Sequence, residues 1–376
     1  MRSDARNRFI SSQTGFIISV ILLCGLGLLT LYVSSATSAL RLFDDETYYL
    51  KRQLVIGLLG ALVAVLISSV NLETFRPLFF PLVLIVMLLC ILTTIPGIGI
   101  EKNGARRWLG FGPLVFQPAE LAKLMTVCYL AHILDKKYDR IQENMFALFP
   151  AITVLGLFVF IIYLQDDFSS TVFIFILGIV MLFFAGIKLR LFFTLFIFAV
   201  PVAFLFIFVE PYRVYRIISY LKPKLDPYGI NYQTIVAQNA IHSSGLWGKG
   251  IGGILRKDSI IPEVQSDFIF AGWVEQWGFF GVIVYFLLLS YMLICGMRIA
   301  MESENRFKGL IVIGSVSAIF FQSVLNCGVV SGVFPSTGIP LPFFSSGGTS
   351  LAITLAFCGI VINISKSNLR VRLDYE

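Results

Sequence analysis

The sequence is poor in charge, since Asp, Glu, Lys and Arg together make up only 14% of its 376 residues. Average soluble domains carry about 25% charged residues. Hydrophobic residues make up 57% of this chain, and its mean hydropathy is +0.86. This composition excludes a soluble globular protein, a disordered protein and a nucleic-acid-binding module, so we expect no nucleic acid among its partners.

Metal-binding and disulfide patterns are also lacking. The chain has only two histidines, His132 and His242, and no cluster of His and Cys. All six cysteines fall inside apolar stretches, without a CxxC spacing or a disulfide framework. We therefore interpret the cysteines as small core residues and expect no tightly held zinc site.

Long hydrophobic runs are abundant. A membrane-spanning helix needs about 20 mostly apolar residues. Ten segments are candidates: 16–36, 53–70, 78–95, 117–134, 149–164, 168–187, 191–209, 272–297, 309–330 and 348–364. The first is too long for a cleavable signal peptide. The sequence predicts an all-α polytopic membrane protein, a single domain over 1–376, with ten transmembrane helices and a long loop at 210–271 between helices 7 and 8.

The distribution of Lys and Arg predicts the orientation. The two termini and the even-numbered loops carry fifteen of these residues, whereas the short odd-numbered loops carry six. Cytoplasmic loops are enriched in Lys and Arg. We therefore expect both termini in the cytoplasm and the long loop outside, and the same excess accounts for the net charge of +7.

Polar residues gather in four stretches, at 96–118, 165–170, 262–278 and 333–350. The predicted orientation puts all four on the outer face of the membrane. They therefore predict one site assembled from distant parts of the chain. In the second stretch, the adjacent acids Asp166 and Asp167 end a span, where such residues are often merely solvated.

The first stretch contains Arg106 and Arg107 beside Trp108. They form either a basic turn with an interfacial aromatic residue or a guanidinium pair that grips phosphate or pyrophosphate. Gln117, Glu120 and Lys123 follow at the start of the fourth span. Glu120 and Lys123 are three residues apart and can pair on one helix face, either as a structural ion pair or as a wall of the site.

The long loop begins with Arg213 and Arg216, which are interleaved with tyrosines. This pattern predicts a short amphipathic helix in the membrane interface, which either holds anionic headgroups or anchors the loop. A second helix is expected to open near Gln233 and to run to about Ser243. A glycine-rich stretch that contains Lys249 follows it.

Asp267 stands between Ser266 and an apolar Phe-Ile-Phe segment, just before the eighth span. Desolvation raises the pKa of a carboxyl group toward the range of a general base. The alternative is a helix N-cap. The fourth stretch, which contains Ser345 and Ser346, is broken by proline and glycine, and forms either a pocket floor or a re-entrant hairpin.

Several of these segments together resemble the SEDS family (shape, elongation, division, sporulation), the group that contains RodA and FtsW. Five stretches carry the resemblance, in the order of the family: NGARRWLGFGPLVFQPAELAKL, QDDFSS, YQTIVAQNAIHSSGLWGKGIGG, PEVQSDFIFAGWVEQWGFFG and GVFPSTGIPLPFFSSGGTS. The LWGKGIGG segment is more similar to FtsW than to RodA, which favours a role in division over one in elongation.

The resemblance implies a peptidoglycan glycosyltransferase, multi-pass in the bacterial cytoplasmic (inner) membrane, that polymerises lipid II. The donor would be a glycan strand on undecaprenyl pyrophosphate, and the acceptor the 4-hydroxyl of the N-acetylglucosamine of lipid II. Asp267 falls on the catalytic aspartate of the family, and Glu120 and Lys123 on its helix motif. The candidate substrate-binding residues are Arg106, Arg107, Gln117, Arg213, Arg216, Gln233, Lys249, Ser345 and Ser346.

The family also implies partners, namely a class B penicillin-binding transpeptidase and other proteins of the division or elongation complex. No cofactor is certain, but a divalent cation, Mg²⁺ or Mn²⁺, is a candidate for balancing the pyrophosphate charge. Two other functions stay open on the sequence alone. One is a lipid II flippase, and the other is a non-catalytic scaffold that recruits a transpeptidase.

Overall fold

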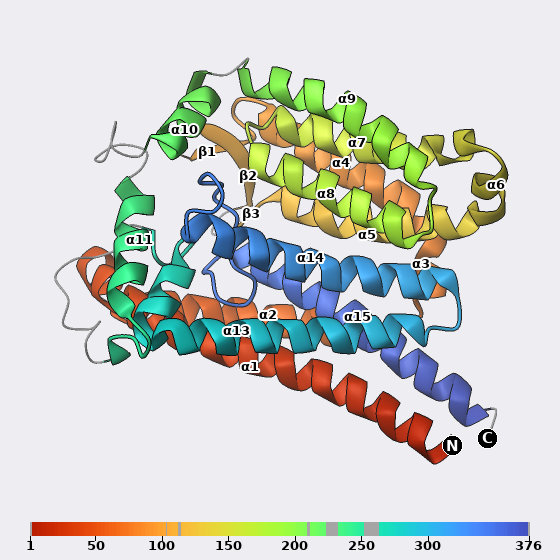
Figure 1. The fold of residues 1–376 in the computed structure, drawn as a ribbon, viewed down its shortest axis with the longest axis horizontal. Coiled ribbons are helices and arrows are strands. Elements are labelled where there is room, and N and C mark those ends of the chain that lie inside the picture. The colour runs from red at the N-terminus through yellow and green to blue at the C-terminus, as the bar shows by residue number, and fades with distance from the viewer. Residues whose placement is uncertain are drawn as a thin grey trace.

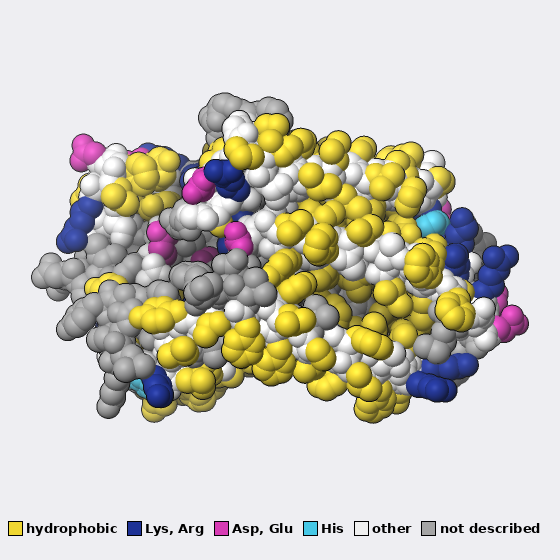
Figure 2. All heavy atoms as spheres, turned by 90° about the horizontal axis from the view of Figure 1, so that it is seen from above, with side chains coloured by type: hydrophobic (Ala, Val, Ile, Leu, Met, Phe, Trp, Pro, Cys, Tyr) yellow, Lys and Arg dark blue, Asp and Glu magenta, His cyan; other side chains and the backbone are white. Residues whose placement is uncertain are grey.

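The computed structural model describes residues 2–102, 104–111, 114–208, 211–222, 232–251 and 263–374. Long helices run side by side along one direction, and both termini lie at the same end of the bundle (Figure 1). The other end carries two shorter helices, a small sheet and the connection between the last two long helices. Hydrophobic side chains cover the middle of the molecule and charged ones gather at its ends (Figure 2), as expected for a membrane protein.

The helices follow one another in the order α1 (Arg2–Phe43), α2 (Tyr48–Ser69), α3 (Leu72–Phe75), η1 (Arg76–Leu78), α4 (Phe79–Thr94), α5 (Pro118–Lys136), α6 (Tyr138–Glu143), η2 (Met145–Leu148), α7 (Phe149–Tyr163), α8 (Phe168–Phe184), α9 (Leu189–Phe208), α10 (Pro211–Leu221), α11 (Tyr232–Ser244), α13 (Ile269–Met301), α14 (Arg306–Val330) and α15 (Gly348–Asp374). The strands are β1 (Ile100–Lys102), β2 (Ala105–Phe111) and β3 (Leu114–Phe116).

Each of the ten predicted spans coincides with a helix of the structure. Within the described residues, seven helical segments are long and apolar enough to cross a membrane. They comprise α1, α2, the α3–α4 segment, the η2–α7 segment, α13, α14 and α15. Helix α8 and the segment Leu189–Phe198 of α9 are apolar but shorter, and α5 carries Glu120 and Lys123. The polytopic helical fold is confirmed, while ten crossings and the extent of the long loop stay predictions.

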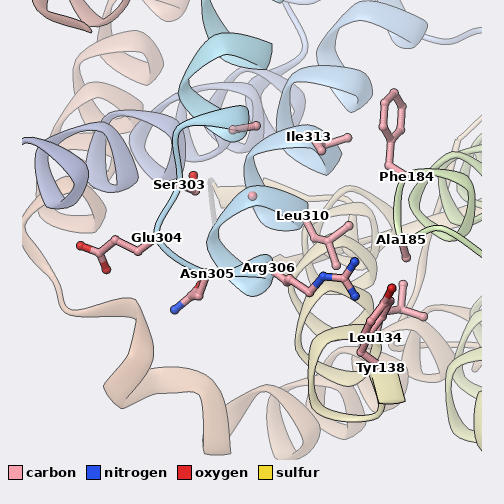
Figure 3. A pocket seen from close by; sticks show the side chains of 12 residues that line it. Leu134, Tyr138, Phe184, Ala185, Ser303, Glu304, Asn305, Arg306, Leu310 and Ile313 are labelled. Carbon is pink, nitrogen blue, oxygen red and sulfur yellow. The ribbon is translucent and has the colours of Figure 1, made fainter. Parts of the chain in front are cut away.

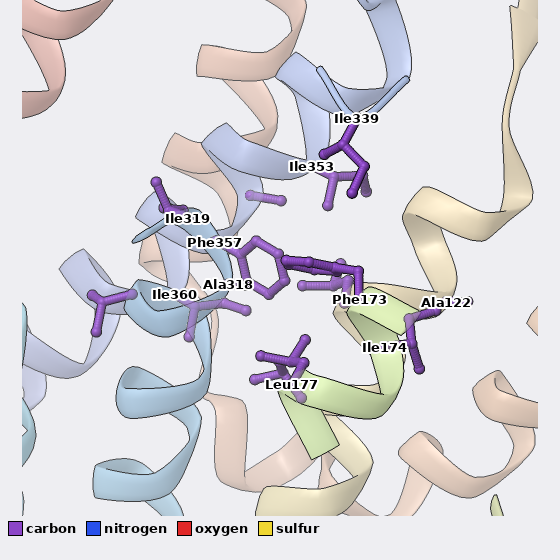
Figure 4. Close-up of a cluster of buried hydrophobic side chains, with 14 of the residues drawn as sticks. Ala122, Phe173, Ile174, Leu177, Ala318, Ile319, Ile339, Ile353, Phe357 and Ile360 are labelled. Atoms are coloured by element: carbon purple, nitrogen blue, oxygen red, sulfur yellow. The ribbon is translucent and has the colours of Figure 1, made fainter. Parts of the chain in front are cut away.

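Helices α14 and α15 form the interior of the bundle. In each of them 72% of the most apolar 18-residue segment is buried inside the protein, whereas only 11% of the corresponding segment of α2 is buried. Figure 4 shows Phe173 of α8 directed toward Phe357 of α15, in a cluster that also holds Leu177 of α8 and Ala318 of α14. Since α14 is enclosed by protein, polar side chains on it face other helices and loops instead of lipid.

The stretch after α4 folds into a three-stranded antiparallel sheet in the order β1-β2-β3. This stretch lies between the third and fourth predicted spans. Gly104 turns the chain between β1 and β2 with a φ of +76°, a conformation that costs glycine little, and Lys102 pairs with Ala105 across that turn. The sheet places Arg106 and Arg107 at the end of the bundle that is remote from the termini (Figure 1).

The connection between α14 and α15 folds back against the helices. At Phe343 its backbone takes a φ of +68°, and Gly27 of α1 packs directly against that residue. A Cβ added to Gly27 would lie 2.4 Å from the Phe343 carbonyl oxygen, whereas nothing lies within 4 Å of the equivalent position at Gly25. Within one turn of α1, Gly27 is therefore in tight contact with the connection, whereas Gly25 faces open space.

We predict opposite effects for alanine at these two positions. Gly27→Ala should lower stability by about 1–3 kcal/mol, because the new methyl group meets backbone that has no room to move. Gly25→Ala should be neutral or stabilising by up to ~1 kcal/mol, because alanine favours the helix. Thermal unfolding of both variants in detergent measures the difference. Equal melting temperatures would show that the loop does not press on α1.

Candidate functional site

Asp267 lies two residues before α13 and is partly buried. Its carboxylate faces the connection between α14 and α15, because a Cβ added to Gly338 would lie 3.2 Å from Asp267 Oδ2. The amide of Asn326, on α14, donates to the backbone oxygen of Asp267 at 2.8 Å and to that of Ile339 at 2.7 Å. One buried side chain therefore fixes the acid and the loop against each other.

The N-cap interpretation of Asp267 does not hold. The cap residue of α13 is Phe268, and no side chain caps this helix. Within the described part of the chain, no group donates a hydrogen bond to the Asp267 carboxylate. The carboxylate is therefore left to interact with a ligand.

The electrostatic surroundings suit an acid-base group. Burial raises the pKa of Asp267 from its ordinary value to about 6, and the negative charges of Glu263 and Asp167 raise it as well. Arg107 and Arg216 act in the opposite direction. A carboxyl group that titrates near neutrality can accept a proton from a substrate hydroxyl and release it again.

Asp167 lies at the site, whereas the sequence analysis considered it only as one of two acids that are often merely solvated. It is only 3% exposed and caps α8, accepting from the backbone N–H of Ser170 at 3.2 Å. Gln117 donates to its Oδ2 at 2.8 Å. Asp is a favoured N-cap residue, but nothing in the sequence showed that this acid is buried beside Gln117.

Arg107 joins the sheet to the same segment. Its Nη1 lies 3.9 Å from Asp167 Oδ1, and its Nη2 donates to the backbone oxygen of Asp166. Arg107 is also among the charges that act on Asp267. The convergence of the first three polar stretches, predicted from the sequence, is thus observed around Asp267.

Arg106 has a different environment. Its Nε donates to Glu101 Oε2 at 3.0 Å, and it lines a cavity of about 330 Å³ together with Glu101, Gln165 and Asp166. Neighbouring residues of a strand point to opposite faces. The structure therefore separates the two arginines that the sequence suggested as a pair, and directs only Arg107 toward Asp267.

Helix α10 confirms the predicted amphipathic helix and lies over the loop between α14 and α15. Arg216 Nη1 donates to the backbone oxygen of Ser336 at 3.3 Å, and the Tyr220 hydroxyl donates to that of Val333 at 2.7 Å. Arg216 is therefore close to the site. The side chain of Arg213 falls outside the described part of the structure.

Glu120 and Lys123 form an ion pair of 2.7 Å inside the bundle. Lys123 also donates to Gln322 Oε1 at 3.0 Å, and Gln322 in turn donates to the backbone oxygen of Pro340 at 3.0 Å. The pair is almost fully buried, with side-chain exposures of 5% and 2%. Of the two interpretations, a structural ion pair or a wall of the site, this geometry favours the ion pair. Through Gln322 it supports the connection between α14 and α15, which we call the site loop.

Ser345 and Ser346 attach the site loop to the segment before Asp267. The Ser345 hydroxyl donates to the backbone oxygen of Ser266 and accepts from the N–H of Leu341. The N–H of Ser346 donates to the backbone oxygen of Gln265 at 2.8 Å. Both serines therefore hold the fourth polar stretch beside the third.

The two remaining candidates from the long loop lie on or just after α11. Lys249 pairs with Glu275 of α13 at 2.8 Å and donates to the Ser243 hydroxyl at 2.8 Å. It fastens α11 to α13. Gln233 lies in the first turn of α11 and is partly buried.

A metal site is not evident from side chains alone. Among the described residues, no three His, Cys, Asp or Glu side chains lie close enough together to hold a metal ion. Asp267 and its neighbours therefore offer too few ligands for a metal bound by protein alone. A divalent cation at this site would need ligands from the substrate.

Comparisons with known protein sequences show which proteins this chain resembles. The family profile described as cell cycle protein, of FtsW, RodA and SpoVE, matches residues 13–370. Stage V sporulation protein E of Bacillus subtilis is 36% identical, over 93% of this chain and 96% of that protein. A probable peptidoglycan glycosyltransferase FtsW of Borreliella burgdorferi is 35% identical, over 95% of this chain and 97% of its own length.

Solved structures of similar fold come from the same group of proteins. A chain from a study of how a peptidoglycan synthase complex coordinates polymerization and crosslinking aligns with a TM-score of 0.79 and 30% identity, over 94% of this chain and 97% of that one. The rod shape determining protein RodA of Thermus thermophilus aligns with a TM-score of 0.69 and 28% identity, over 94% of this chain and 96% of that one.

The electrostatics of Asp267 can be measured directly. The infrared carboxyl band that is lost in Asp267→Asn should titrate in the wild-type protein with a midpoint near pH 6. Asp167→Asn should move this midpoint lower, because it removes a negative charge that raises the pKa of Asp267. An unchanged midpoint in Asp167→Asn would show that the two acids do not interact.

Proposed function

Since the chain belongs to the cell cycle protein family of FtsW, RodA and SpoVE and is a peptidoglycan glycosyltransferase, we propose that Asp267 is the general base of its transfer reaction. The observation that carries this proposal is the position of the Asp267 carboxylate. It is partly buried, faces the site loop, receives no hydrogen bond from the described residues and has a pKa raised to about 6.

The reaction joins a donor glycan on undecaprenyl pyrophosphate to the 4-hydroxyl of an acceptor N-acetylglucosamine of lipid II. The acceptor oxygen attacks C1 of the donor while the bond from C1 to the pyrophosphate oxygen breaks. An α-linked donor thereby gives a β-linked glycan, with inversion. Asp267 takes the proton of the acceptor hydroxyl, and the electron pair of the broken bond leaves with the pyrophosphate.

The leaving pyrophosphate gains negative charge, which the site must stabilise. Arg107 and Arg216 are the cations that act on Asp267, and guanidinium groups bind phosphate oxygens in a bidentate manner. We assign these two arginines to the pyrophosphate. A divalent cation carried by the pyrophosphate would add charge of the same sign and act as a Lewis acid.

Glu120, Lys123 and Asn326 are positioning residues in this proposal. Lys123 acts through Gln322 on the loop that faces Asp267, and Asn326 binds that loop and the backbone of Asp267 together. Their removal would leave the reacting groups in the site and would change their separation. Misplacement of reacting groups by about 1 Å can reduce a rate ~10²-fold.

The membrane arrangement extends the same proposal. The protein is a multi-pass membrane protein, and both termini lie at the end of the bundle remote from the start of α13 (Figure 1), which Asp267 precedes by two residues. We place the termini in the cytoplasm on the distribution of Lys and Arg, in the inner membrane of a bacterium. The site then opens on the outer face.

A penicillin-binding transpeptidase is the expected partner, and other division proteins are expected with it. The similarity to a chain of a peptidoglycan synthase complex supports the first of these partners. The relatives named FtsW support a role in division.

Replacement of Asp267 tests the general base. Asp267→Asn should reduce glycan polymerisation from purified lipid II by about 10²–10⁴-fold, the usual contribution of a general base. Asp267→Glu should retain part of the activity. The wild-type rate should fall about tenfold per pH unit below pH 6, because the protonated carboxyl cannot accept a proton. Full activity of a folded Asp267→Asn protein would remove Asp267 from the chemistry and reject the assignment.

The two arginines provide a matched comparison. Arg107→Gln should weaken the apparent affinity for lipid II about tenfold or more, because it removes a charge-assisted bond to phosphate. Arg106→Gln should have a much smaller effect, because its guanidinium binds Glu101 on another face of the strand. The Michaelis constants of both variants measure this contrast. A larger effect at Arg106 would assign the phosphate to the cavity beside Glu101.

A further inference from the structure

A second cavity lies at the other end of the bundle, where the chain begins and ends. It measures about 330 Å³ and is lined by the ends of α5 and α8, the start of α6, the turn between α13 and α14, and the first turns of α14 (Figure 3). Ligand pockets in proteins span about 300–1,000 Å³. The catalytic proposal does not involve this cavity.

The cavity has an apolar wall and a polar mouth. The apolar wall is formed by Leu134, Phe184, Leu310 and Ile313, which come from three different helices. Phe184 is 42% exposed, so this wall continues onto the outer surface of the bundle, where lipid lies. A ligand with an apolar part can therefore enter from the side of the membrane.

Arg306 stands at the mouth. Its guanidinium carbon lies 3.1 Å from the centre of the Tyr138 ring, a stacking that holds the planar group in place. Within the described residues, Arg306 forms no ion pair and no hydrogen bond through its side chain. Its charge-assisted donors are therefore free to bind an anion.

The other charges at this mouth leave a positive balance. Glu304, which also lines the cavity, is bound by Lys308, and Figure 3 shows its side chain directed away from Arg306. Lys136 and Lys137 directly precede Tyr138 in the chain, and Asp139 and Arg140 directly follow it, so this segment carries three cations and one anion. The mouth therefore attracts an anion, and the wall attracts a hydrocarbon chain.

We propose that this cavity binds an anionic membrane lipid, with its phosphate on Arg306 and the start of an acyl chain along the apolar wall. Basic pockets between spanning helices on the positively charged side of a membrane protein are suited to such headgroups. A soluble phosphate compound would use Arg306 but not the wall beside Phe184. This proposal does not rest on the glycosyltransferase mechanism.

Lipid binding to the delipidated full-length protein in detergent tests the proposal. Native mass spectrometry would count bound phosphatidylglycerol, with phosphatidylcholine as the neutral comparison. We expect phosphatidylglycerol to be retained in preference. Arg306→Gln should bind it about tenfold more weakly, through loss of a charge-assisted contact to phosphate. Arg306→Lys should lie in between, because lysine keeps the charge but not the planar fork.

Two further variants distinguish lipid binding in this cavity from a general attraction of anionic lipid to positive charge. Arg52→Gln makes the same change of charge on the exposed start of α2, at the other end of the bundle, and should bind phosphatidylglycerol as the wild type does. Ile313→Trp fills the apolar wall without changing charge, and should weaken binding as Arg306→Gln does.

Three results would overturn the proposal. They are equal retention of the neutral and the anionic lipid, unchanged binding by Arg306→Gln, and complete displacement of phosphatidylglycerol by excess inorganic phosphate. The last would mean that the site takes a soluble anion. Circular dichroism and gel filtration of each variant confirm that it is folded, so that a loss of binding reports on the cavity.

Discussion

The buried amide of Asn326 is the contact on which the arrangement of the site depends. It donates both of its N–H groups to backbone oxygens, one at Asp267 and one at Ile339. Those oxygens belong to segments about 70 residues apart in sequence. Unsatisfied carbonyl groups are costly inside a membrane protein, so this single side chain stabilises two irregular segments at once and sets the distance between the acid and the loop that faces it.

The same requirement accounts for the other polar residues in the interior. Gln322 donates to the backbone oxygen of Pro340, and Gln53 donates to that of Ser345. The chain between α14 and α15 lacks regular structure over much of its length, so its carbonyls have no helical partners. Helices that otherwise carry apolar side chains supply the missing donors. The charge on Lys123 is tolerated in the interior because Glu120 and Gln322 surround it.

The sequence predicted the helices well, because spanning segments are defined by local composition and length. It also identified Asp267, whose polar side chain stands out between Ser266 and an apolar run. It could not show that Arg106 and Arg107 have different environments, because that depends on the small sheet. The strands pair locally, as Lys102 does with Ala105, but they are short and no strand was predicted there. Asp167 was missed as a site residue for a different reason. Its role depends on burial beside Gln117 and Arg107, and these neighbours come from a part of the chain about 50 residues earlier.

The pairing of Ser346 with Gln265 and of Ser345 with Ser266 has a consequence for biosynthesis. The surroundings of Asp267 are completed by residues that the ribosome adds about 80 positions after Asp267. Helices α1 to α9 can insert and pack before those residues exist, since domains assemble progressively during translation. The nascent protein therefore passes through a long inserted stage without a finished site, and polymerising capacity arises only once α15 has joined the bundle.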